Sequence, residues 1–238
     1  APALIVWPEL PAPIYYADDH TLQNEIASLA KTTRAPVLLG TVATDSDGSP
    51  LNSAQLVSAR GEPAGRYDKI YLVPLGEYVP KVFWWVNRIT PEAGDFKPGE
   101  RPGVFPLEGA RMGVFICYES AVPRLVRDLA SRGGEVLFNL SNDGYFFRTA
   151  AREQHLMLVR MRAAENRRWI LRATNNGITA AIDPAGRVIA QLPPFEESSA
   201  QFAFSTVKET TFYSRHGDWF SWLCLAGAAV ALVASQRP

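Results

Sequence analysis

Runs of apolar residues alternate along the chain with segments whose apolar positions recur every three to four residues, an order typical of α/β proteins. The expected strands are residues 3–7, 37–43, 54–59, 112–117, 136–140, 169–173, 178–182 and 200–204, and the expected helices are residues 21–33, 122–131 and 150–168. Turn-forming sequences at 60–65 and 183–186 join some strands directly, whereas helices separate others. The pattern therefore predicts mixed sheets in an α/β fold.

Composition and charge narrow the class of protein. The 238 residues are 47% apolar, and Lys+Arg 24 balance Asp+Glu 24, so the formal net charge is zero. This balance argues against nucleic-acid binding by bulk electrostatics. Two cysteines cannot form a disulfide framework, and three widely separated histidines lack the spacing of metal ligands. We expect one main domain over residues 1–214, with no metal, cofactor or nucleic acid bound.

The end of the sequence is strongly apolar. Residues 219–235 carry no charged side chain, and as a helix they would measure about 26 Å, slightly less than a bilayer core of ~30 Å. Trp219, Phe220 and Trp222 gather at one end, as residues of a membrane interface do. We expect residues 215–238 to form a transmembrane or membrane-interface helix. The alternative is a buried C-terminal core helix.

Two aromatic clusters lie in segments with the composition of loops. They are Phe83, Trp84 and Trp85, within the Pro- and Gly-rich stretch 76–101, and Tyr145, Phe146 and Phe147, which follow Asn-Asp-Gly. Long loops in compact domains usually bind ligands or cover sites. Together with the apolar tail, the clusters indicate a surface that contacts lipid. The alternative is that each cluster folds back onto the core.

One cysteine and two charged residues lie at the ends of strand-like runs. Cys117 closes one run just before a predicted helix, where a nucleophile has free backbone N–H groups beside it. Glu9 follows the first run and can take a thiol proton, while Lys69 can stabilise a developing negative charge. No histidine is placed to act as the base. The alternatives are a buried core cysteine and two solvated surface charges.

In chain order, these three residues resemble the Glu–Lys–Cys triad of the nitrilase superfamily of carbon–nitrogen hydrolases. The matching stretches are Trp7-Pro8-Glu9, Tyr67-Asp68-Lys69 and Ile116-Cys117-Tyr118-Glu119. The resemblance covers nearly the whole chain. It implies a nitrilase-like αββα sandwich with mixed sheets, in which Glu9 is the general base, Lys69 stabilises the oxyanion and Cys117 is the nucleophile.

Within the superfamily, the sequence is most similar to the apolipoprotein N-acyltransferase family. The similarity rests on residues 74–80, 139–146, 154–156, 162–168 and 215–219. It implies acyl transfer from a phospholipid to the N-terminal amine of a lipoprotein's diacylglyceryl-cysteine through a cysteine thioester, at the periplasmic face of the bacterial inner membrane. Glu77 would support the triad electrostatically, and Tyr118 and Glu119 would shape the pocket beside the nucleophile.

The resemblance also predicts segments that the printed sequence lacks. Family members carry a bundle of membrane helices ahead of the catalytic domain, and the superfamily fold has an opening strand before the run at 4–7. We therefore expect a piece of a longer protein or a truncated relative. Two other functions are open: a soluble amidase or nitrilase acting on small C–N substrates, and a non-catalytic module that binds membranes.

Overall fold

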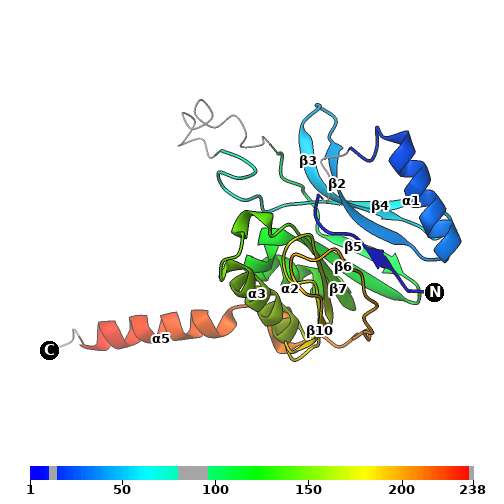
Figure 1. The fold of residues 1–238 in the computed structure, drawn as a ribbon. Helices are drawn as coiled ribbons and strands as arrows, with labels where there is room; N and C mark the ends of the chain where they lie inside the picture. Colours follow the sequence, from blue (N-terminus) through cyan, green and yellow to red (C-terminus); the bar gives the residue numbers. More distant parts are fainter. Residues whose placement is uncertain (11–14, 80–95, 236–238) are drawn as a thin grey trace.

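Two β-sheets packed face to face form the centre of the molecule (Figure 1), which a computed structural model describes for residues 1–10, 15–79 and 96–235. The smaller sheet has the order β1-β2-β3-β4. Its strands are β1 (Ile5–Val6), β2 (Val37–Thr44), β3 (Pro50–Val57) and β4 (Pro63–Asp68). β1 runs parallel to β2, and the remaining neighbours are antiparallel. The ends of β1 and β4 lead into Glu9 and Lys69.

The larger sheet contains the strands of the second half of the chain, in the order β10-β9-β8-β7-β6-β5. They are β5 (Gly103–Leu107), β6 (Ala110–Ile116), β7 (Val136–Ser141), β8 (Ile170–Thr174), β9 (Ala180–Ile182) and β10 (Val188–Gln191). β6, β7 and β8 are parallel neighbours. The residues that follow these three strands therefore meet at one edge of the sheet.

Helices cover the outer face of each sheet. They are α1 (His20–Thr33) on the smaller sheet, and α2 (Pro123–Ser131) and α3 (Ala151–Asn166) on the larger one. α1 begins after Asp19, whose carboxylate accepts the N–H of Leu22 at 2.9 Å, a common N-cap contact. It ends at Arg34, which adopts the left-handed conformation typical of helix C-termini.

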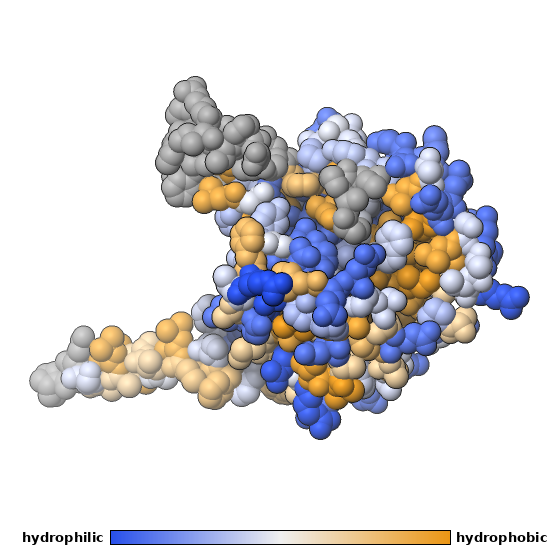
Figure 2. Space-filling view, in the orientation of Figure 1, coloured by the Kyte–Doolittle hydropathy of each residue, from blue (hydrophilic) through white to orange (hydrophobic). Residues whose placement is uncertain are grey.

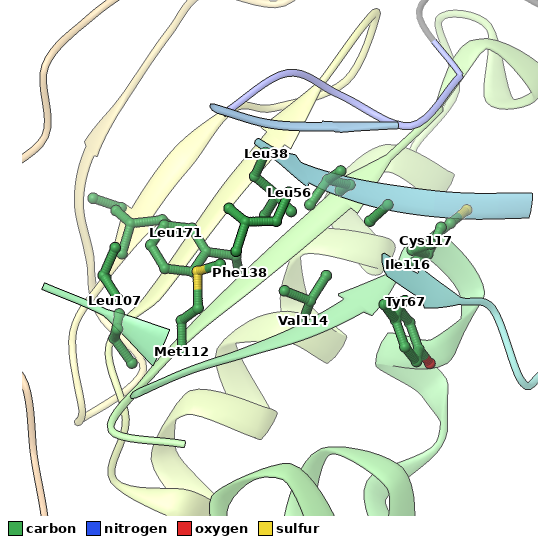
Figure 3. Close-up of a cluster of buried hydrophobic side chains, with 14 residues drawn as sticks. Leu38, Leu56, Tyr67, Leu107, Met112, Val114, Ile116, Cys117, Phe138 and Leu171 are labelled. Carbon is green, nitrogen blue, oxygen red and sulfur yellow. The ribbon is translucent and has the colours of Figure 1, made fainter. Parts of the chain in front are cut away.

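Three clusters of buried apolar side chains join the four layers. The central cluster lies between the sheets, with Leu38 and Leu56 from one and Met112 and Phe138 from the other (Figure 3). A second cluster packs α2 and α3 onto the larger sheet, and a third packs Ile26 of α1 onto the smaller one. These layers confirm the predicted αββα sandwich with mixed sheets.

Most predicted elements are confirmed, but one strand is wrong. Residues 200–204 have no regular secondary structure, because Phe202 and Phe204 pack against the core without a neighbouring strand to pair with. Three strands, β4, β5 and β10, were not predicted. β4 is largely polar and lacks the apolar run by which buried strands are found, and Pro106 within β5 argued against a strand there.

The C-terminal part contains two further helices. α4 (Phe212–His216) contacts α2 and α3, and α5 (Trp219–Ser235) projects away from the sandwich as an apolar rod (Figures 1 and 2). Every residue of α5 is exposed, so the buried core helix considered from the sequence is wrong. Among the helices of the described residues, none has both the length and the apolar character of a bilayer span.

Candidate active site

Cys117 lies at the carboxyl end of β6, where the chain turns into a short helix. It opens the 3-10 helix η2 (Cys117–Ala121), and α2 begins at Pro123. The φ angle of Cys117 is 49°, in the left-handed region, which costs a non-glycine residue about 1–3 kcal/mol. Such a conformation persists only where the surrounding contacts impose it. The side chain is buried, with 9% of the residue exposed.

Three charged side chains from the segments that follow β1 and β4 form a largely buried cluster. Lys69 Nζ lies 3.0 Å from Glu9 Oε1 and 2.9 Å from Glu77 Oε2, and only 1% of Lys69 is exposed. The amide of Asn52, on β3, donates to Glu9 Oε1 at 2.7 Å and to Glu77 Oε1 at 2.6 Å. The backbone N–H of Asn142, after β7, donates to Glu9 Oε2 at 2.7 Å. Both sheets therefore hold Glu9 in place.

The charges of this cluster act on the Cys117 thiol. Burial, followed by the charge of Glu9, raises the pKa of the thiol to about 12, although Lys69 and a hydrogen bond with Ser141 oppose the rise. Burial alone would lower the pKa of Lys69. The negative charges of Glu9, the Cys117 thiolate and Glu77 outweigh burial and raise that pKa above its usual value. At neutral pH the site thus pairs a protonated thiol with a fixed cation and a carboxylate.

Glu119 connects the turn after β6 to the loop after β4. One of its oxygens accepts hydrogen bonds from the Tyr67 hydroxyl at 2.7 Å and from the N–H groups of Ile70 at 2.8 Å and Tyr71 at 3.1 Å. The other accepts the N–H of Ile116 at 2.6 Å. Complete burial raises the pKa of Glu119 to about 7, although these hydrogen bonds oppose the rise. Glu119 thus braces two loops.

A second buried network contacts the backbone of Cys117, and the sequence interpretation missed it. Asp143 follows β7 and accepts hydrogen bonds from Ser141 at 2.9 Å and from Arg172, on β8, at 2.7 Å. Its Oδ1 also lies 2.9 Å from Nδ1 of His155, on α3, whose Nε2 lies 3.1 Å from the carbonyl oxygen of Cys117. Burial disfavours the charge of Asp143, but His155, Arg172 and Ser141 lower its pKa to about 2. The sequence signal for this network was Arg172, a charged residue within the otherwise apolar run of β8.

A cavity of about 460 Å³ lies against the short helix that begins at Cys117. Tyr118, the residue after Cys117, lines it and is 41% exposed. The opposite wall comes from the loop that follows Lys69 and includes Leu72 and Tyr78. The lining is mainly apolar, so the cavity suits a hydrocarbon chain.

The predicted aromatic clusters have different outcomes. Phe83, Trp84 and Trp85 lie outside the described residues. Tyr145 is 79% and Phe147 is 76% exposed, so these two side chains do not fold back onto the core. Phe146 is half-buried, and its ring packs edge-to-face on His155 with 5.6 Å between the centroids.

Comparison with known proteins identifies the family. The family model for carbon-nitrogen hydrolase matches residues 2–212. The chain belongs to the carbon–nitrogen hydrolase family. Among curated relatives, this carbon–nitrogen hydrolase is 38% identical to the apolipoprotein N-acyltransferase of Geobacter metallireducens, over 98% of its own length and 46% of the relative's. It is 39% identical to that of Synechocystis sp., over 84% and 38% of the two chains. The chain thus spans about half the length of the curated relatives it matches.

The solved structures agree on the fold of this carbon–nitrogen hydrolase. An amidase from Nesterenkonia sp. superposes with a TM-score of 0.62 at 21% identity, over 80% of this chain and 73% of the amidase. At this identity the likeness concerns the fold alone. It confirms the nitrilase-like sandwich that the sequence resemblance predicted.

Proposed function

We propose that this domain transfers a fatty acyl chain from a phospholipid to the N-terminal amine of the diacylglyceryl-cysteine of bacterial lipoproteins. The names of the relatives support this choice over a soluble amidase. One observation carries the chemistry: the buried cluster of Glu9, Lys69 and Glu77 acts on a thiol at a strained turn. A base, a fixed cation and a nucleophile are the parts that acyl transfer needs.

In the first half-reaction, Glu9 removes the proton of the Cys117 thiol. The sulfur attacks the ester carbonyl carbon, a C–S bond forms, and Lys69 stabilises the negative charge on the carbonyl oxygen. When the tetrahedral intermediate collapses, the C–O bond to the glycerol oxygen breaks. Glu9 returns the proton to that oxygen, so a lysophospholipid leaves and a thioester remains on Cys117.

In the second half-reaction, the lipoprotein amine attacks the thioester carbonyl. Glu9 accepts a proton from the attacking nitrogen, and Lys69 again stabilises the oxyanion. The C–S bond then breaks, and the proton passes to the sulfur of Cys117. The products are an amide on the lipoprotein and the free enzyme. Glu77 shares Lys69 with Glu9 and keeps the ammonium group in place throughout.

The surface supports access to a membrane. The apolar cavity beside Tyr118 would receive the acyl chain, and exposed Tyr145 and Phe147 together with α5 would contact lipid. We therefore propose that the domain works at a bacterial inner membrane, with phospholipid as donor and apolipoprotein as acceptor. Its periplasmic orientation, and the division into residues 1–214 and 215–238, remain predictions.

The test is the intact mass of the protein after incubation with phosphatidylethanolamine in mild detergent, beside a Cys117→Ala control. We expect the mass of one acyl chain to be added to the wild type, removed by hydroxylamine and absent from the control. Absence of this adduct combined with hydrolysis of small amides would favour the amidase instead. Absence of both reactions would refute catalysis by this domain.

A further inference from the structure

The backbone of Cys117 needs an external restraint. A non-glycine residue at a φ of 49° relaxes unless neighbouring groups hold it, and the next element, η2, is too short to fix its own first residue. Glu119 restrains the residue before Cys117 through the N–H of Ile116. The carbonyl of Cys117 itself is held from the other side by His155 Nε2, at 3.1 Å.

The orientation of His155 is itself determined by buried charges. A carbonyl oxygen only accepts hydrogen bonds, so the ring must carry a proton on Nε2. The other nitrogen, Nδ1, lies 2.9 Å from Asp143 Oδ1 and 3.2 Å from Arg172 Nη2. Arg172 also donates to Asn139 on β7 at 2.6 Å, which fixes the guanidinium within the sheet. Asp143 and Arg172 are 0% and 2% exposed, so water does not compete for these contacts.

We propose that His155 is a positioning residue for Cys117. Held through Asp143, which Arg172 in turn holds at 2.7 Å, the Nε2–H of His155 donates to the Cys117 carbonyl and keeps the nucleophile in the left-handed turn. In this turn the sulfur faces the charges of Glu9 and Lys69 and can meet an acyl carbonyl beside the oxyanion donors. His155 does not act as a base, since its contact is with the backbone of Cys117. The inference rests on the proposed thioester chemistry and adds to it a geometric requirement.

Two reactions of Cys117 distinguish the positioning of its sulfur from the amount of thiolate that is present. Alkylation by iodoacetamide needs a thiolate but no oxyanion site, whereas acylation by p-nitrophenyl acetate needs both. Neither reaction requires lipid or a lipoprotein. We would measure both rates for the wild type and variants, with peptide-level mass spectrometry to separate Cys117 from the exposed Cys224. The ratio of the acylation rate to the alkylation rate is the readout.

His155→Leu should lower this ratio roughly 10- to 100-fold, because a small misplacement of a nucleophile has effects of this size. His155→Gln, whose amide N–H can replace Nε2–H, should recover part of it. Arg168→Leu is the matched control. It removes buried donors to the carbonyls of Gly134 and Glu209, at the opposite edge of the sheet, and should leave the ratio unchanged.

Each outcome decides the inference. An unchanged ratio in His155→Leu, or an equal drop in Arg168→Leu, overturns the positioning role while leaving the proposed function intact. If His155→Leu does not fold, Asp143→Asn, which keeps the shape of the side chain but not its charge, must lower the ratio; an unchanged ratio there overturns the inference. A wild type that is alkylated but never acylated refutes the proposed function, and the inference with it.

Discussion

Removal of Lys69 should disrupt the fold as well as the chemistry. In Lys69→Met, the carboxylates of the buried Glu9 and the half-buried Glu77 lose their cation and keep only neutral donors: the amide of Asn52, which they share, and the N–H groups of Asn142 and Val73. Removing one partner of a buried ion pair costs about 3–5 kcal/mol. Because two carboxylates lose the same cation, we expect the loss to lie near the upper end of this range. Domains have total stabilities of about 5–15 kcal/mol, so the variant should be close to unfolding.

A second substitution should reverse part of this loss. In Lys69→Met with Glu77→Gln, only Glu9 stays charged, and it keeps the N–H of Asn142 and the amide of Asn52. We expect about 2 kcal/mol to be recovered, so that the two substitutions are far from additive. The raised pKa of Lys69 means that its stabilisation is complete below the ordinary value of 10.5 and is lost only above it. The effect should therefore be the same at pH 7 and pH 9.

The assay is urea unfolding followed by tryptophan fluorescence in mild detergent. Lys97→Met is the matched control, because Lys97 also pairs with two carboxylates, Asp45 and Asp47, but at an exposed site. Its substitution should change the unfolding midpoint little, since water and salt screen exposed pairs. Equal midpoints for Lys69→Met and Lys97→Met, or a double variant less stable than Lys69→Met, would refute the reasoning.

Three further predictions concern the Cys117 thiol, the Glu119 carboxyl group and the exposed aromatic residues Tyr145 and Phe147. Glu9→Gln should lower the rate of acyl transfer roughly 10²- to 10⁴-fold, because the proposed base is lost. Loss of the Glu9 charge should also lower the pKa of the Cys117 thiol and so speed its alkylation at pH 8; slower alkylation would contradict the effect assigned to this charge. The pKa of about 7 for Glu119 lies above the ordinary 4.5, so its proton contributes stability below pH 4.5 that is lost as pH rises through 7. The free energy of unfolding of the wild type, measured by thermal unfolding, should thus fall by up to about 3 kcal/mol between pH 5 and 8, and this fall should be absent in Glu119→Gln. The same dependence of stability on pH in both proteins would exclude this pKa for Glu119. Tyr145→Ser with Phe147→Ser should weaken co-sedimentation with anionic vesicles but not alkylation of Cys117, and unchanged co-sedimentation would remove both residues from the lipid surface.

Sequence patterns predict those strands and helices whose own residues favour the structure without help from a neighbouring strand. β6 and β7 are mainly apolar, because strands covered on both faces bury nearly every residue. β4 and β10 are short and partly polar, and they form because a preceding strand and a tight turn bring a partner alongside. The turn signals were visible in the sequence, but the strands they introduce were not. The wrong strand at 200–204 shows the converse, since alternating aromatics pack on the core there without a pairing partner.

Some residues of the candidate site could likewise be predicted from the sequence, and others could not. Glu9, Lys69 and Cys117 could be proposed from the sequence because each borders a strand-like run and their order resembles a known triad. Asn52 and His155 could not, because each is a single polar residue in an ordinary strand or helix. Their partners lie 43 and 38 positions away in the sequence, and only the packing of the layers brings them together.

The position of the site between two sheets makes its chemistry depend on their packing. The larger sheet carries Cys117 and buries it, which raises the pKa of the thiol. The largest charge effects on the thiol come from Glu9 and Lys69, which follow strands of the smaller sheet. Hydrogen bonds near Cys117 link the segments of the two sheets: the Asn142 N–H donates to Glu9, and Glu119 accepts from Tyr67 on β4 and from the loop after it. Because a shift of one sheet would separate Glu9 from the Cys117 thiol, the proposed mechanism requires the apolar core around Leu56 and Phe138 as much as it requires the polar residues.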